Sequence, residues 1–350
     1  MPAHAEDLRV ATFAADFSRE GPGLLLRDIL SGDDPQVIAA TAAITVIAPD
    51  IVVLTRFDWD YGGAALDALA ESLADQGLIY GHRFTAQPNS GMATGLDLDG
   101  DGRLGRARDA MGYGRFAGEG GLAILSRWQI DVNAVRDLTP LLWRDLPGAV
   151  LPTTASAEPF PSAEVHAMLR LSSVAHWVVP VAAPGGTVNL MVWSATPPVF
   201  DGPEDMNGLR ARDELRLWQV LMDGGLGAVP EGAFVIAGNS NLDPEDGDGD
   251  TAAMTAFLAD RRWQDPRPAS AGGALAADAG HMGDPALDTA DWPDGAPGNL
   301  RVSYVLPSSD WTVTGAGVFW PAPEDPAAAL LGEDGLAAGP HRLVWVDLQR

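Results

Sequence analysis

Cysteine is absent from the 350-residue chain, which excludes a disulfide framework and thiolate metal sites. No apolar run approaches the roughly 20 residues that a membrane-spanning helix needs. Basic residues are scarce, because 22 Lys and Arg stand against 48 Asp and Glu, a formal net charge of -26. Nucleic-acid affinity comes largely from cationic side chains that neutralise phosphates, so this balance argues against nucleic acid as a partner.

The start of the chain has neither the basic nor the apolar region of a signal peptide. Ala3, His4 and Ala5 nevertheless match the small-x-small pattern that precedes a signal cleavage point. We therefore expect a mature secreted or periplasmic protein that is not inserted in a membrane.

Strand-like segments recur between turns rich in Gly and Pro. Strands are predicted at residues 8–13, 51–54, 122–125, 176–181, 188–193, 234–237, 300–306, 311–319 and 342–347. Helices are predicted at 35–48, 64–76 and 210–222. Helices alternate with strands early and strands dominate later, which predicts mixed sheets covered by helices in a single domain, residues 8–348. Surface excursions are expected at about 85–120 and 264–299, where the chain is rich in Gly and polar residues.

Seven short motifs follow one another in order at the ends of these predicted strands. They are Leu8–Phe13, Pro49–Leu54, Gly121–Arg127, Trp193–Pro198, Gly238–Asn241, Arg301–Leu306 and Gly339–His341. Their order resembles the endonuclease/exonuclease/phosphatase superfamily, which includes DNase I-like nucleases, and residues 196–218 resemble a subgroup common among secreted bacterial proteins. The resemblance implies an α/β fold, a four-layer sandwich of two mixed β-sheets flanked by helices.

The resemblance also implies a phosphoesterase site at the strand ends. Such chemistry needs a carboxylate-held Mg²⁺, a carboxylate that activates water, and His or Asn donors for the phosphoryl oxygens. Two positions, Asn241 and His341, keep the family side chain. Seven positions carry a different residue: Ala14 for an Asn, Arg56 for the metal-binding Glu, Ser194 for a His, Asn239 for the general-base Asp, Ser303 for a later Asp, and Gly339 and Pro340 for the Ser and Asp of the last motif.

These substitutions predict a catalytically impaired or inactive protein that is kept as a binding scaffold. Arg56 would hold a small anionic ligand in the former metal position, or the cleft would bind a protein partner. The Mg²⁺ that the family uses is not expected here. The alternative is a divalent-metal-dependent phosphoesterase, that is a phosphodiesterase, phosphatase or nuclease, with relocated groups such as Asp58, Asp246 or His176. Each of these groups also has a non-catalytic interpretation. Asp58 and Asp246 would lie in solvated loops, and His176 would be a hydrogen-bonded structural residue.

A second pattern concerns a hard cation. Asp97, Asp99 and Asp101 alternate with other residues around a Gly-containing turn, as oxygen ligands do in one-loop calcium sites. The position of the closing Glu in a regular EF-hand loop is Arg108, but Asp109 follows it directly. The pattern favours Ca²⁺ bound by these four aspartates, with a solvated acidic turn as the alternative.

Overall fold

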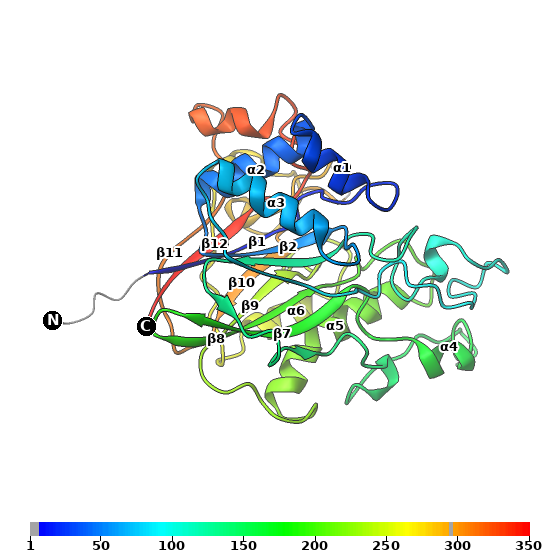
Figure 1. The fold of residues 1–350 in the computed structure, drawn as a ribbon. Helices are drawn as coiled ribbons and strands as arrows, with labels where there is room; N and C mark the ends of the chain where they lie inside the picture. The colour runs from blue at the N-terminus through cyan, green and yellow to red at the C-terminus, as the bar shows by residue number, and fades with distance from the viewer. Residues whose placement is uncertain (1–6, 294–296) are drawn as a thin grey trace.

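The computed structural model describes residues 7–293 and 297–350. The Ala3–Ala5 cleavage pattern therefore lies outside the described residues. Two six-stranded sheets, each with parallel and antiparallel pairs, lie one above the other, and helices cover their outer faces (Figure 1). This arrangement confirms the predicted four-layer α/β sandwich. In the described part of the chain, no helix is long and apolar enough to cross a membrane.

The first sheet has the strand order β11-β12-β1-β2-β4-β3. The bounds are β11 (Thr312–Val318), β12 (Val344–Gln349), β1 (Leu8–Phe13), β2 (Ile51–Phe57), β4 (Gly121–Ser126) and β3 (His82–Thr85). Helices α1 (Leu24–Ser31), α2 (Pro35–Ile47) and α3 (Ala64–Asp75) cover its outer face, at the top of Figure 1. β1 and β2 run parallel, so the polypeptide leaves both strands at the same end of the sheet.

The second sheet has the order β10-β9-β8-β7-β5, and β6 pairs with β7. The bounds are β10 (Ser303–Pro307), β9 (Phe234–Asn239), β8 (Gly186–Ser194), β7 (Ala175–Ala183), β5 (Gln129–Ile130) and β6 (Arg136–Asp137). Helices α5 (Met206–Met222) and α6 (Thr251–Leu258) pack below it (Figure 1). The shorter helices are α4 (Ala163–Met168) and α7 (Ala271–Leu275), and short 3-10 helices lie at Ala107–Asp109, Trp143–Asp145, Pro285–Leu287 and Pro326–Leu331.

The buried core lies between the two sheets and continues under both helical layers. The central strands consist of apolar runs because both of their faces are covered, as residues 51–54 show with complete burial. Helix α1 was not predicted, since the preceding Gly21-to-Gly23 turn obscured its start. The 85–120 excursion has little regular structure, yet Asn89 is buried and its amide donates to two backbone carbonyls.

Candidate functional site

Three of the predicted site positions form a row across adjacent strands. Parallel pairing of β8 with β9 sets Ser194 opposite Asn239, and antiparallel pairing of β9 with β10 sets Ser303 opposite Asn239. All three residues are buried, at 2–4% exposure. In the described residues the Ser303 hydroxyl has no hydrogen-bond partner. This row is neutral, because hydroxyls and an amide stand at the positions of an imidazole and two carboxylates.

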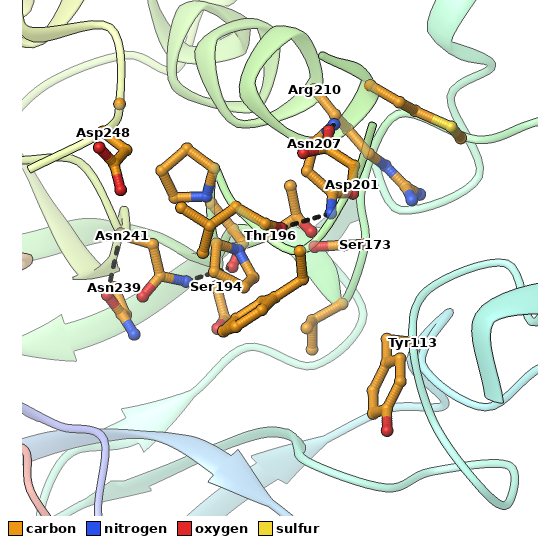
Figure 2. Close-up of a pocket in the computed structure, with 18 of the residues that line it drawn as sticks. Tyr113, Ser173, Ser194, Thr196, Asp201, Asn207, Arg210, Asn239, Asn241 and Asp248 are labelled. Atoms are coloured by element: carbon orange, nitrogen blue, oxygen red, sulfur yellow. Dashed lines mark hydrogen bonds between the residues drawn. The ribbon is translucent and has the colours of Figure 1, made fainter. Parts of the chain in front are cut away.

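Asn241 lies just beyond this row. Its backbone adopts the left-handed conformation, with φ 54°. Its backbone N–H donates to Asn239 Oδ1 over 3.0 Å, and its side-chain amide donates to the Ala195 carbonyl over 2.7 Å. Figure 2 shows Ser194, Asn239 and Asn241 gathered on one side of the pocket. Both amides are thereby fixed in orientation.

The first sheet contributes Ala14 and Arg56 from the parallel strands β1 and β2. Ala14 follows the last residue of β1 and is buried. Arg56 lies at a bulge of β2, has φ 60° and exposes 45% of its side chain. Its Nη2 lies 2.8 Å from Asp16 Oδ1. The cation at the former metal-ligand position thus already has an anionic partner.

His341 closes the site from the C-terminal part of the chain. It is 2% exposed and packs edge-on against Trp292, with ring centroids 5.2 Å apart. Burial, together with the nearby charges of Arg56 and Arg342, lowers the pKa of His341 to about 3. Its Nδ1 has no hydrogen-bond partner among the described residues. At neutral pH this imidazole is uncharged.

The predicted site residues converge. A cleft of about 1250 Å³ is lined by five of them, namely Arg56, Ser194, Asn239, Asn241 and His341. Ser303 pairs with Asn239 on the neighbouring strand, and Ala14 lies two residues before Asp16 in the chain.

The relocated groups differ in what they contact. Asp58 is buried, and its two oxygens accept the backbone N–H groups of Arg19 and Gly120 at 2.8 and 2.9 Å. Asp58 therefore joins two loops, and the reading of a solvated loop at this residue was wrong. His176 is fully buried between Ser172 Oγ and the Glu214 carbonyl, and burial lowers its pKa to about 3. His176 therefore has the structural, hydrogen-bonded role that was the alternative to a catalytic one.

Asp246 alone of the relocated groups lines the cleft. Its carboxylate accepts the backbone N–H groups of Met282 and Gly283, both at 2.8 Å. The neighbouring Asp243 is buried and accepts three backbone N–H groups, including that of Arg301 at 2.6 Å. These carboxylates hold loops together at one end of the cleft.

Sequence reasoning missed the buried pair that supports the cleft from α5. Glu214 accepts the N–H and hydroxyl of Ser173 and the N–H of Thr196 at 2.5–2.7 Å. Arg210, one helical turn earlier, donates to the carbonyls of Met111 and Leu171. The signal was their four-residue spacing, which places both on one face of the predicted helix. Figure 2 shows Ser173 and Thr196 at the wall that this pair supports.

The acidic loop brings together three of its four predicted ligands. Asp97, Asp99 and Asp109 each offer a carboxylate oxygen within 4.8 Å of the others. Asp101 is not part of this group, and its carboxylate accepts the Arg103 N–H instead. Burial opposes ionisation of Asp97, but the N–H groups of Gly102 and other loop residues outweigh it and lower its pKa. In the described part of the chain this is the single carboxylate or histidine cluster with ion-binding spacing.

Comparison with known proteins gives a consistent picture of the fold. Residues 22–337 match the model of the Endonuclease/Exonuclease/phosphatase family. No curated protein matches the chain. An endonuclease/exonuclease/phosphatase from Beutenbergia cavernae DSM 12333 is similar at 19% identity and a TM-score of 0.55, over 98% of this chain and 71% of that one. Sphingomyelinase C from Streptomyces griseocarneus is similar at 15% identity and a TM-score of 0.51, over 98% of this chain and 99% of that one. At these identities the likeness shows a shared fold.

Proposed function

The chain belongs to the endonuclease/exonuclease/phosphatase family, and from that premise we propose that it is a binding protein whose phosphoesterase centre is catalytically impaired. The cleft has a volume of about 1250 Å³, whereas the side chains that the chemistry needs are replaced.

The observation that carries this proposal is the Arg56–Asp16 ion pair beside the neutral row of Ser194, Asn239 and Ser303. A hard cation such as Mg²⁺ is held by carboxylate and other oxygen ligands. A guanidinium at the ligand position repels the cation and is paired with the Asp16 carboxylate. Without a bound metal, neither the phosphoryl oxygens nor a metal-bound water is activated.

Proton transfer is impaired for a related reason. Asn239 stands where a carboxylate would act as general base, and an amide does not accept a proton near neutral pH. Its Oδ1 is also engaged by the Asn241 N–H. His341 is neutral, so it does not offer the positive charge that would stabilise a phosphoryl group.

The alternative of a metal-dependent phosphoesterase with relocated groups now rests on Asp246. Asp58 and His176 are both enclosed by hydrogen-bond partners, as described above. Asp246 lines the cleft together with Asn241. The Asp246→Asn variant therefore separates the two candidate functions.

We also propose that Asp97, Asp99 and Asp109 bind Ca²⁺, as a structural ion rather than a catalytic one. Oxygen ligands on a tight loop suit calcium. Their spacing supports this assignment, and Asp99 also lines the cleft, so an ion here would stiffen one cleft wall.

The test is hydrolysis of bis-p-nitrophenyl phosphate, p-nitrophenyl phosphate and DNA with Mg²⁺, Mn²⁺ or Ca²⁺. We expect turnover at the level of the blank. Turnover that scales with protein and is abolished by His341→Ala or Asp246→Asn, but not by the control His82→Ala on β3, would overturn the proposal. A positive control carries the family residues at five positions: Arg56→Glu, Ser194→His, Asn239→Asp, Ser303→Asp and Pro340→Asp.

A further inference from the structure

The rim of the cleft is strongly acidic. Besides the buried Asp243, six carboxylates line it without an ion pair to any arginine in the described part of the chain: Asp99, Asp101, Asp201, Glu204, Asp246 and Asp248. Figure 2 shows Asp201 and Asp248 on two different walls. A ligand that spans these walls meets negative charge at both ends.

Three arginines also line the cleft, but two are already engaged. Arg56 is paired with Asp16, and Arg210 is buried with its guanidinium donating to backbone carbonyls. Only the exposed Arg108 remains to offset the six carboxylates. The anionic ligand expected from Arg56 is therefore poorly matched to this surface, and a cationic ligand is well matched.

The floor has a different character, because it is polar and neutral. In the described residues no hydrogen bond uses Asn239 Nδ2 or Asn241 Oδ1, which leaves one donor and one acceptor. The buried His341 Nδ1 is also without a partner. A peptide unit presents one C=O and one N–H, which complements an amide donor and an amide acceptor.

Two exposed aromatic rings also line the cleft. Tyr113 and Phe200 line it while remaining 66% and 73% exposed. Figure 2 shows Tyr113 across the pocket from Asn239 and Asn241. Aromatic faces attract guanidinium and ammonium groups and cover their aliphatic stems.

We propose that this cleft binds an extended, arginine- or lysine-rich segment of a partner protein. Asn239 and Asn241 bond its main chain, and Asp201, Glu204 and Asp248 on the rim hold its cationic side chains. The inference rests on the proposed function, since it assigns a ligand to the same cleft. The volume exceeds the roughly 300–1,000 Å³ typical of small-molecule pockets. A nucleic acid would place phosphates against the rim carboxylates, and a polyamine has no C=O for the amide donor of the floor.

The experiment is fluorescence anisotropy with a labelled decapeptide of alternating arginine and glycine. Because the whole protein carries a charge of -26, two variants with the same charge change are compared. The cleft variant is Asp201→Asn, Glu204→Gln and Asp248→Asn. The control variant is Asp33→Asn, Asp75→Asn and Glu333→Gln, all exposed and outside the cleft lining. We expect the cleft variant to weaken binding at least tenfold and the control less than twofold.

A further variant tests the floor. Asn241→Gly removes the amide at a backbone position that glycine adopts readily, so it should fold normally and weaken peptide binding about fivefold. Equal losses for the cleft and control variants would overturn the proposal, because they would mean non-specific charge attraction. Spermine binding that equals the peptide and is insensitive to Asn241→Gly would also overturn it, as would preference for single-stranded DNA. Absence of both peptide binding and hydrolysis defeats this inference alone, whereas hydrolysis defeats the proposed function.

Discussion

Arg56 occupies a backbone conformation that most residues avoid. Its φ of 60° lies at the bulge where β2 leaves regular pairing with β4. Its ion pair with Asp16 is close to half exposed on both sides, so solvent screens it. The residue therefore matters more for the chemistry of the cleft than for stability.

The Arg56→Gly variant is expected to change the free energy of unfolding by less than about 1 kcal/mol, since glycine accepts this φ and the lost pair is screened. The Arg56→Val variant is expected to cost about 2 kcal/mol, because a β-branched side chain is strained at positive φ. Urea denaturation measures both. Equal stability of the two variants would contradict the backbone assignment.

Asp288 is a buried carboxylate facing other acids. It lines a cavity of about 70 Å³ with Asp246 and His281. Burial, and then the charge of Asp243, raises the pKa of Asp288 from 3.8 to about 7. The folded protein therefore binds this proton more tightly than the unfolded chain does. The resulting penalty is complete above about pH 7, shrinks as pH falls, and is gone below about pH 4.

Asp288→Asn removes that penalty. We expect the variant to be more stable than the parent by about 1–2 kcal/mol at pH 8, with the gain shrinking steadily at pH 6.5 and pH 5. Urea denaturation at the three pH values checks this. A gain that is constant with pH, or grows on acidification, would show that Asp288 is not protonated near neutrality in the folded protein.

At the scale of elements, α5 fixes two loops of the cleft through one side chain. Glu214 is fully buried and holds Ser173 and Thr196, and Arg210 lies beside it on the same helix. Removing the carboxylate leaves Arg210 as a buried charge and turns an amide NH₂ toward N–H donors.

We expect Glu214→Gln to cost about 2–4 kcal/mol of unfolding free energy. The matched control Glu71→Gln, on the exposed face of α3, should stay within about 0.5 kcal/mol. Denaturant titration compares the two. A cost for Glu214→Gln no larger than the control would mean that α5 does not anchor these loops.

The acidic loop gives a calcium-dependent prediction with an internal control. Ca²⁺ should raise the melting temperature and EGTA should lower it, because an ion bound to the folded state stabilises that state. Asp97→Asn should abolish the response, whereas Asp101→Asn should keep it, since Asp101 lies outside the cluster. Differential scanning fluorimetry reports both. Loss of the response in Asp101→Asn as well would contradict the three-ligand assignment.

Part of the candidate site could be predicted from the motifs at the strand ends. The resemblance of the strand-end motifs to the family located Ser194 and Asn239, and the pairing of β8 with β9 places them side by side. The sequence did not reveal Asp16 as the partner of Arg56, because that contact depends on a loop whose path is set by tertiary packing. It also did not reveal the roles of Asp58, whose donors lie 39 and 62 residues away.

For the molecule as a whole, charge and architecture act together. The sandwich carries a cleft lined from both sheets, and the protein has a net charge of -26 and six rim carboxylates without an ion pair to arginine among the described residues. Such a field repels polyanions and accelerates association with cationic partners. This field is the reason why we propose a cationic ligand for the cleft.

The most direct measurement is the anomalous difference map of a crystal soaked in Mn²⁺. We predict no ion among Arg56, Asn239, Asn241 and His341, because their neutral and cationic groups do not hold a divalent cation. A peak at Asp97, Asp99 and Asp109 is compatible with it. An ordered Mn²⁺ bound by Asn239, Asn241 or His341 would contradict it.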